Sequence, residues 1–317
     1  MKGGGFKMRV VEGLDSLEGP FERAVVTIGN FDGVHKGHQA LFARVKEKAR
    51  EIGGTAVAVT FEPHPAKVLH PNTPAPPRIT LYEQKAELIA ANGIDALVCI
   101  PFSMVFAALG AMAFLKDILI HRIGMKAIVV GRDYTFGKHR EGNVDFLEKH
   151  AQELGFEVIC EPWVDTVPGH GRISSTTVRK TVMAGDVAVA FDLLGRYYQV
   201  RGTVVSGRGR GGSALGFPTA NIALTDELCP ANGVYAVTVE YGGRRLKGVA
   251  NIGYSPTFED HLFTVEVHIF DFAEQITGQR IRVNFIERLR DEKKFSGIDE
   301  LKRQIAVDAA EARRILA

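Results

Sequence analysis

The hydrophobic and polar positions along the chain change their pattern near residue 185. Before that point, apolar runs of strand length alternate with segments whose apolar residues recur at helical spacing. The strand-like runs are residues 25–28, 55–61, 96–100, 127–131 and 156–160. The helix-like segments between them begin at Gln39, at Thr80 with Glu83 as a capping box, near Met112 and near Val144. This alternation predicts a parallel sheet with helices on both faces.

After a short helix and connector at 185–198, closely spaced strand-like runs dominate. They are residues 198–205, 233–239, 246–252, 263–270 and 280–286, and YGGRR at 241–245 has the composition of a hairpin turn. Strands joined by short turns favour an antiparallel barrel. The periodic apolar residues from Ile298 to Ile315 predict one closing amphipathic helix.

We therefore predict an α/β protein of two domains within its 317 residues. Residues 1–185 form a Rossmann-like domain, with a parallel sheet between two layers of helices. Residues 186–317 form an antiparallel β-barrel with a C-terminal helix.

The first candidate site is the stretch VVTIGNFDGVHKGH at 25–38. An apolar strand stops at a turn in which Gly29, Gly33 and Gly37 let the backbone come close to a ligand. His35 and His38 stand where the next helix begins, and helix N-termini favour anions. The loop therefore suggests a phosphate site, and His35-Lys36-Gly37-His38 resembles the HxGH signature of the nucleotidyltransferase superfamily. The alternative is a pair of solvated histidines, or one histidine that caps the helix.

Two more loops of the first half carry polar residues beside an expected element. GRDYTFG at 131–137 follows a strand, and ISSTTVRK at 173–180 precedes a helix. Ser174, Ser175 and Thr176 have the hydroxyls of helix caps, while the planar cation of Arg179 suits phosphate. An ordinary N-cap with a solvated arginine is the alternative.

These motifs resemble a known family. GNFDGVHKGH, TFEPHP at 60–65, VGRDYTFG and ISSTTVR, in this order, are similar to the adenylyltransferase module of bacterial bifunctional riboflavin kinase/FAD synthetases. The resemblance implies that this half transfers AMP from ATP to FMN, with His35, His38 and Arg179 as catalytic residues. It implies an ATP site of Gly29, Asn30, Phe31, Asp32, Gly33, His35, His38, Asp133, Ser175, Thr176 and Arg179, and a flavin site of Phe61, Pro63, His64, Pro65, Phe136 and Gly137.

The second half has its own phosphate-type loop, SGRGRGGSALGFPTANI at 206–222. It lacks the GK[ST] of a Walker A loop. Its glycines and arginines could bind phosphate or contact RNA as an arginine-glycine segment. The remaining alternative is a surface loop without a ligand. Thr219 and Asn221 lie two residues apart on an expected strand, hence on one face, and carry oxygen atoms of the kind that Mg²⁺ prefers.

Here too the residues resemble the same enzymes. GFPTAN, NGVYAV, NIGYSPTF and EVHIFDF are similar to the riboflavin kinase module. The resemblance implies that Thr219 and Asn221 hold Mg²⁺ and the nucleotide phosphates, and that Glu266 takes the proton from the ribityl 5′-hydroxyl. It also implies a phosphate loop of Gly207, Gly209, Arg210, Gly216, Pro218, Thr219 and Asn221, and a flavin contact at Arg290. The alternatives are an ion-paired Glu266 and a solvated charged segment around Arg290.

Three positions depart from the family pattern. Ser213 and Ala214 stand beside LGFPTAN, where the family often has a basic residue. Thr277 stands where tyrosine is common, and Tyr197 where proline is common. These departures concern the affinity or the flap of the kinase module more than its proposed catalytic residues.

Composition narrows the function classes. The net charge of +2 gives no support for a nucleic-acid-binding surface, and no apolar segment is long enough for a membrane span or a signal peptide. Three widely spaced cysteines indicate neither a CxxC metal site nor a disulfide framework. We expect a cytoplasmic enzyme that binds neither nucleic acid nor membranes, with an oligomer possible but not predicted.

The expected activity has two steps, both with MgATP. Riboflavin is phosphorylated to FMN, and FMN is adenylated to FAD with release of pyrophosphate. Two alternatives remain open at this point: only one module is active, or the protein is a flavin- or nucleotide-binding regulator without turnover.

Overall fold

The computed structural model describes residues 8–164, 171–205, 217–224, 226–254 and 263–317. The chain divides into two compact units. The first consists of Met1–Pro76 and Thr80–Ser174, and the second of Pro77–Ile79 and Ser175–Ala317. The boundary that the sequence places at 185/186 stays a prediction.

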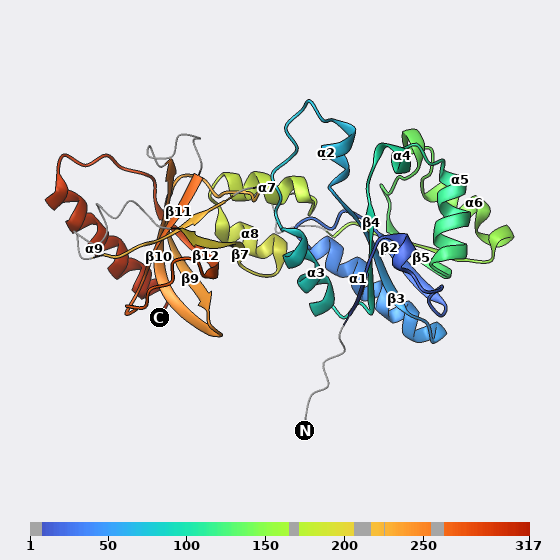
Figure 1. Cartoon of the computed structure of the whole chain (residues 1–317), viewed down its shortest axis with the longest axis horizontal. Coiled ribbons are helices and arrows are strands. Elements are labelled where there is room, and N and C mark those ends of the chain that lie inside the picture. Colours follow the sequence, from blue (N-terminus) through green and yellow to red (C-terminus); the bar gives the residue numbers. More distant parts are fainter. Residues whose placement is uncertain (1–7, 165–170, 206–216, 225, 255–262) are drawn as a thin grey trace, which may run out of the picture. The chain divides into compact units, whose positions relative to one another are not determined.

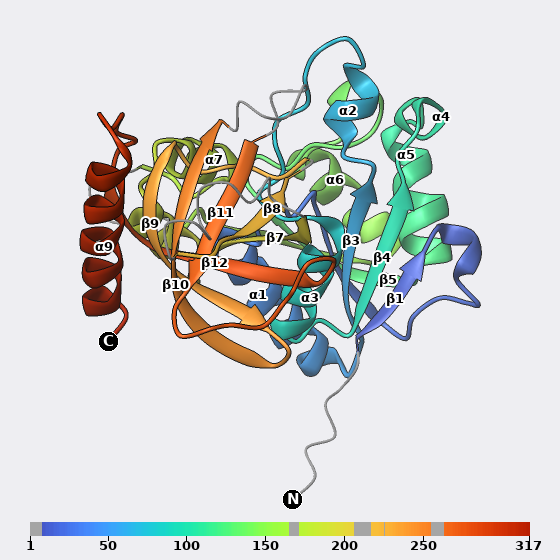
Figure 2. The ribbon, with the colours of Figure 1, turned by 60° about the vertical axis from the view of Figure 1, so that its left-hand side comes forward.

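A six-stranded parallel sheet forms the centre of the first unit (Figures 1 and 2). Its order is β1-β4-β3-β2-β5-β6, so the direction of winding reverses between β2 and β5. The strands are β1 (Arg9–Glu12), β2 (Ala24–Ile28), β3 (Ala56–Glu62), β4 (Ala96–Pro101), β5 (Met125–Gly131) and β6 (Glu157–Glu161). Ligands of open α/β sheets bind at such a reversal, beside the carboxyl ends of the strands.

Helices cover both faces of this sheet because alternate strand residues enter two different cores. Val25 packs with Phe42 and Val45 of α1, whereas Val26 packs with Leu119 on the other face. The helical segments are η1 (Leu14–Ser16), α1 (Lys36–Ile52), α2 (Pro65–Leu69), α3 (Tyr82–Ala91), α4 (Met104–Ala107), α5 (Ala111–Ala113), η2 (Phe114–Arg122, π-helical), η3 (Lys138–Arg140) and α6 (Val144–Leu154). Strands buried on both faces explain the continuous apolar runs of the sequence.

The second unit contains a closed antiparallel barrel of order β10-β11-β8-β7-β12-β9. Helices α7 (Ser175–Met183) and α8 (Val187–Leu194) precede it. The strands are β7 (Tyr198–Val205), β8 (Ala220–Ala223), β9 (Gly233–Tyr241), β10 (Arg244–Tyr254), β11 (Phe263–Ile269) and β12 (Arg280–Arg290), and α9 (Ile298–Ile315) follows. Closure leaves the barrel without an edge strand.

The barrel wall separates an apolar interior from an outer face that carries polar residues. Val265 and Val267 of β11 are fully buried, while Glu266 between them is only half-buried. Helix α9 covers another part of the wall, where Ala309 and Ala312 pack against Val234. Glu266, the predicted proton acceptor, therefore lies on the outer face of the barrel.

The predicted fold class is confirmed, and three local expectations change. Helix α3 has Leu81 as its N-cap without a side-chain cap, so the predicted capping box is wrong. Helix α2 interrupts the expected Pro- and His-rich loop, and β1 adds a strand before the first expected one. The hydroxyl of Thr80 bonds to the glycine-rich loop instead of capping α3.

Candidate active sites

The loop between β2 and α1 has an unusual backbone. Phe31 and Val34 have φ angles of 47° and 40°, a region that non-glycine residues and above all β-branched residues seldom adopt. Their side chains are nevertheless buried, at 1% and 0% exposure. The N–H of Val34 donates to the Phe31 carbonyl, and the Val34 carbonyl accepts from Gln39 Nε2 at 2.9 Å. Such strain, worth on the order of 1–3 kcal/mol per residue, persists only where surrounding contacts fix it.

The two histidines of this loop stack on each other. Their ring centroids lie 3.6 Å apart at an interplanar angle of 18°. His35 is the N-cap of α1, and its Nδ1 accepts from the N–H of His38 at 3.4 Å. His38 also meets the edge of the Phe31 ring, with centroids 5.3 Å apart. His35 therefore caps the helix, as the alternative interpretation expected, and the histidine pair also lies at the helix N-terminus, as a phosphate site requires.

Thr80 holds the middle of the same loop. Its hydroxyl accepts from the N–H of Gly33 at 3.0 Å, and its own N–H donates to Asp32 Oδ1 at 3.0 Å. All three groups are buried. The carboxylate of Asp32 thus serves the loop itself, and its predicted ATP contact stays a prediction.

The residues expected to bind flavin gather at the carboxyl ends of β3 and β5. Phe61 and Phe136 belong to one row of aromatic rings through Phe106 and Phe114, with successive centroids 5.8, 5.9 and 5.8 Å apart. Gly137 has a φ of 75°, and a Cβ there would lie 2.8 Å from backbone atoms of Ala111, so this position requires glycine. Phe114 and Phe136 are buried in the core, whereas Phe61 and Phe106 are partly buried, so only the Phe61 end of the row leaves apolar surface for a flat ring system.

Pro63, His64 and Pro65 start α2, directly after β3. The Nδ1 atom of His64 accepts from the N–H of Ala66 at 3.1 Å, so this ring is the N-cap of α2. This position lies beside Phe61, and its flavin contact stays a prediction.

Asp133, a predicted ATP-site residue, forms a small cluster with two residues that the sequence did not indicate. Arg172 donates to its carboxylate at 2.7 Å, and the Arg172 guanidinium lies 4.4 Å from the centroid of the Trp163 ring. Burial opposes ionisation of Asp133, but the hydrogen bond and charge of Arg172 outweigh it, so the pKa of the carboxyl lies below its ordinary value. Neither Arg172 nor Trp163 belongs to the predicted site.

Ser175, Thr176 and Arg179 lie on α7, in the second compact unit. Nε of Arg179 donates to the Pro77 carbonyl at 2.9 Å. Their part in an ATP site together with His35 and His38 stays a prediction.

The barrel brings three polar residues into one row across neighbouring strands. Glu266 of β11 stands directly opposite Asn221 of β8 on one side and Asn251 of β10 on the other. Residues so placed have Cβ atoms about 5 Å apart. Thr219 precedes β8, and its place on the same face as Asn221 stays a prediction. Strand register therefore brings the predicted base next to Asn221, one of the two predicted metal ligands.

Burial raises the pKa of Glu266 above its ordinary value, because the half-buried carboxylate is partly removed from water. The ion pairs found in the described parts of the chain do not include this carboxylate. The alternative of a structural ion pair thus finds no support there. A carboxylate with a raised pKa is a better proton acceptor than a solvated one.

Hard oxygen atoms on Thr219 and Asn221 fit Mg²⁺ in type. Within the described ranges, no group of three or more His, Cys, Asp or Glu side chains is placed to hold a metal ion. A magnesium ion at this barrel face would therefore depend on hydroxyl and amide oxygens together with nucleotide phosphates.

The structure describes only some of the remaining residues predicted for the kinase site. Gly207, Gly209, Arg210 and Gly216 lie outside the described residues, as do the departures at Ser213 and Ala214. The carbonyl of Pro218 lies 2.9 Å from Nδ1 of His268. Pro218 stays a prediction as a nucleotide contact.

Arg290 is engaged by helix α9. Its Nε and Nη2 donate to the Asp308 carboxylate at 3.0 and 2.7 Å, and Asp308 is 6% exposed. This ion pair ties the end of β12 to the helix. A flavin contact at Arg290 stays a prediction.

Comparisons with known proteins match both halves of the chain. The FAD synthetase family model matches residues 18–177, and the riboflavin kinase family model matches residues 194–316. The chain belongs to the bifunctional riboflavin kinase/FMN adenylyltransferase family. The relative of that name from Escherichia coli K12 is 39% identical over 313 residues, which are 96% of this chain and 97% of the relative. The one from Pseudomonas fluorescens is 40% identical over 312 residues, 98% of each chain.

One solved structure matches nearly the whole chain. It is titled a macrolide-efflux protein from Streptococcus pneumoniae, is 33% identical, and has a TM-score of 0.86 over 96% of this chain and 99% of its own. Its likeness supports the fold of both units, while the activity in its title belongs to that protein. None of the helices in the described part of our chain has both the length and the apolar character that crossing a bilayer requires.

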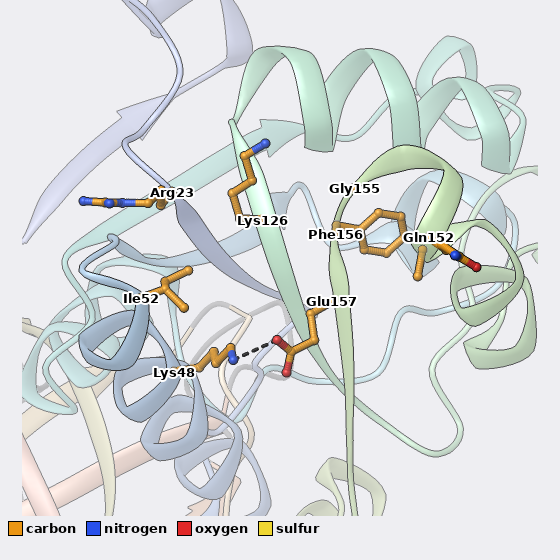
Figure 3. A pocket seen from close by; sticks show the side chains of 9 residues that line it. Arg23, Lys48, Ile52, Lys126, Gln152, Gly155, Phe156 and Glu157 are labelled. Atoms are coloured by element: carbon orange, nitrogen blue, oxygen red, sulfur yellow. Dashed lines mark ion pairs between the residues drawn. The ribbon is translucent and has the colours of Figure 1, made fainter.

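An open groove of about 460 Å³ lies at the other edge of the parallel sheet (Figure 3). It is lined at the amino ends of β2, β5 and β6 by Arg23, Lys126 and Glu157, and Lys48 forms an ion pair with Glu157 at 2.7 Å. No predicted site residue lines it. The loop of His35 and His38, where the sequence predicts the nucleotide site, follows β2 at the carboxyl edge.

Two residues beside these sites were not indicated by sequence patterns. Asn251 lies within the NIGYSPTF motif, but only strand register shows that it faces Glu266. Lys85 looks like a surface lysine of an amphipathic helix, yet it is buried and bonds to the loop after β2. A lysine on the apolar stripe of a predicted helix is the signal that could have found it.

Proposed function

We propose that the chain makes FAD from riboflavin in two steps at two sites. The barrel unit transfers the γ-phosphoryl group of ATP to riboflavin, giving FMN and ADP. The parallel-sheet unit then transfers AMP from a second ATP to FMN, giving FAD and pyrophosphate. Family membership over nearly the whole chain supports both steps.

The observation that carries the kinase step is the register of Glu266 beside Asn221. The ribityl 5′-hydroxyl has to lose a proton as its oxygen bonds to the γ-phosphorus and the bond to the ADP oxygen breaks. Glu266 accepts that proton, and its raised pKa suits this role. Thr219 and Asn221 would hold Mg²⁺, which neutralises phosphate charge when bound.

The adenylyl step needs alignment more than a base. A phosphate oxygen of FMN is already a nucleophile, and it attacks the α-phosphorus of ATP while the bond to pyrophosphate breaks. His35, His38 and the N–H groups at the start of α1 supply donors to the phosphates. Phe61 and Phe106, at the partly buried end of the aromatic row, offer an apolar surface for the flavin ring.

The finer parts of this proposal extend beyond family membership. They are magnesium at Thr219 and Asn221, the ATP contacts of Arg179, the flavin contact of Arg290, and a cytoplasmic location. The substrates and products are ATP, riboflavin, FMN, FAD and pyrophosphate, with no nucleic acid or membrane partner.

The test is a time course with purified protein, riboflavin and MgATP, in which flavins are separated by chromatography. We expect FMN to appear first and then to give way to FAD. If no FMN forms while supplied FMN is converted to FAD, the kinase half of the proposal fails. If neither product forms although flavin binds, the chain is a flavin-binding protein without turnover.

A further inference from the structure

Helix α3 carries a lysine that is buried against the parallel sheet. Lys85 is 6% exposed, and its helix enters the apolar core through Ile89, which is fully buried. Lysine side chains are almost never fully buried unless their charge is compensated. The contacts of this ammonium group therefore indicate what its burial stabilises.

Those contacts lead directly to the two signature loops. Nζ of Lys85 donates to the carbonyl oxygen of Asn30 at 3.2 Å and to the hydroxyl of Thr60 at 3.1 Å. The Thr60 hydroxyl in turn lies 3.4 Å from the same Asn30 oxygen. Thr60 is fully buried near the carboxyl end of β3, and Asn30 follows β2. One ammonium group thus links the starts of GNFDG and FEPHP.

The Asn30 carbonyl belongs to the peptide that enters the strained part of the loop. Phe31, the next residue, has a φ of 47°. In a trans peptide the C=O and N–H bonds point in opposite directions, so fixing the Asn30 oxygen at Lys85 turns the Phe31 N–H away from the ammonium. Thr80 fixes the next turn of the loop through Gly33, and Gln39 fixes its end through Val34.

We propose that Lys85 is a positioning residue for adenylyl transfer. Through the Asn30 carbonyl it sets the orientation of the Asn30–Phe31 peptide and so keeps the loop in the shape that receives the triphosphate. Its positive charge also favours negative charge at this edge of the sheet. This inference rests on the proposed FMN adenylyltransferase activity.

The same unit offers a matched control. Lys48 of α1 is 7% exposed, and its Nζ forms ion pairs with Glu51 and Glu157, each at 2.7 Å. These contacts lie at the groove of Figure 3, on the amino edge of the sheet. Lys48→Met therefore removes an equally buried ammonium without touching the loop after β2.

The experiment compares Lys85→Met, Lys48→Met and Thr60→Val in the full chain. Initial rates of FAD formation from FMN are measured against ATP and against FMN, and the riboflavin kinase rate of each sample is the internal reference. We expect Lys85→Met to lower kcat/KM for ATP at least about tenfold, with KM for FMN within about twofold. Thr60→Val, which removes one ammonium contact, should lower it about threefold, and Lys48→Met less than about twofold.

The outcomes separate the two claims. If the wild-type chain makes no FAD from FMN, the proposed function fails. If it does, and Lys85→Met loses no more activity than Lys48→Met, the positioning role is overturned, because a purely structural lysine would behave so. A change confined to KM for FMN also overturns it. Should Lys85→Met unfold the first unit, as seen by circular dichroism, Thr60→Val decides, and unchanged ATP kinetics in that variant overturn the role.

Discussion

The two units of this chain build their sites in different ways. In the parallel-sheet unit the key residues lie on a strained loop, which is held by Thr80 and Lys85 from a distant part of the sequence. In the barrel unit, Asn221, Glu266 and Asn251 are placed by strand register alone. A loop site therefore depends on contacts that surround it, whereas a register site depends on the pairing of its strands.

Replacing the proposed base should have the largest effect. Glu266→Gln keeps the size of the side chain but cannot accept a proton, so the kinase rate should fall about 10²–10⁴-fold. Adenylation of supplied FMN should stay unchanged, because Glu266 is not among the residues predicted for that reaction. Steady-state assays of both reactions on one sample check this. Loss of both activities would contradict the separation of the two sites.

The loop site is tested next by His38→Ala. Removing a ring that stacks on His35 and that we propose as a donor to phosphate should lower FMN adenylation about 10²-fold. Riboflavin phosphorylation should stay as in the wild type. His121→Ala is the control, since that histidine is largely exposed on η2. A variant of His38 that adenylates FMN at the normal rate would exclude the histidine pair from this chemistry.

A smaller effect is expected from Thr80→Val, which leaves Gly33 N–H and Asp32 without their hydroxyl partner. Losing these two buried hydrogen bonds should cost about 1–3 kcal/mol in the unfolding free energy of the first unit. Adenylation should fall by about tenfold as the loop relaxes. Calorimetry and initial rates measure the two quantities.

Thr27→Val is the matched control for Thr80→Val. Thr27 is fully buried on β2, and in the described part of the chain its Oγ1 finds no hydrogen-bond partner. Its replacement should leave stability equal or higher. An equal loss of stability in both variants would mean that the hydrogen bonds of Thr80 to the loop do not stabilise it specifically.

The smallest expected effect is a pH-dependent change in the stability of the barrel unit. Because burial raises the folded-state pKa of Glu266, the folded unit binds this proton more tightly than the unfolded chain does. The stabilisation by protonation is complete below the unfolded pKa and is lost as pH rises through the folded pKa. At neutral pH Glu266→Gln should therefore raise the melting temperature slightly, even though it lowers the kinase rate.

The kinase rate should respond to pH in the opposite sense. The base must be ionised, so kcat/KM of the wild type should fall as pH drops through the raised pKa. Calorimetry of Glu266→Gln and the pH profile of the wild type measure these two changes. A lower melting temperature in Glu266→Gln would contradict a desolvated carboxylate.

Local patterns were sufficient for most of the fold. The apolar runs and turns predicted the strands of both units except β1, since each pattern arises within a few residues. Helix α2 was missed because prolines and histidines surround it, although Pro65 and His64 are suitable for its first turn and cap. Thr80 and Glu83 matched a capping box, but Asp32 and Gly33 compete for the threonine, and this competition depends on tertiary structure.

The sequence could predict those candidate site residues that lie within recognisable motifs. His35, His38 and Glu266 stand within recognisable motifs, and the structure places each beside predicted partners. Lys85 and Asn251 could not be found in this way, because their significance arises from packing and from register.

The central claim is that one chain holds two separable sites, and mixing two defective variants tests it most directly. Glu266→Gln alone should make no FMN from riboflavin and MgATP, and His38→Ala alone should stop at FMN. An equimolar mixture should make FAD, because FMN released by one variant is adenylated by the other. A mixture that stops at FMN, or a His38→Ala chain that makes no FMN, would contradict the account.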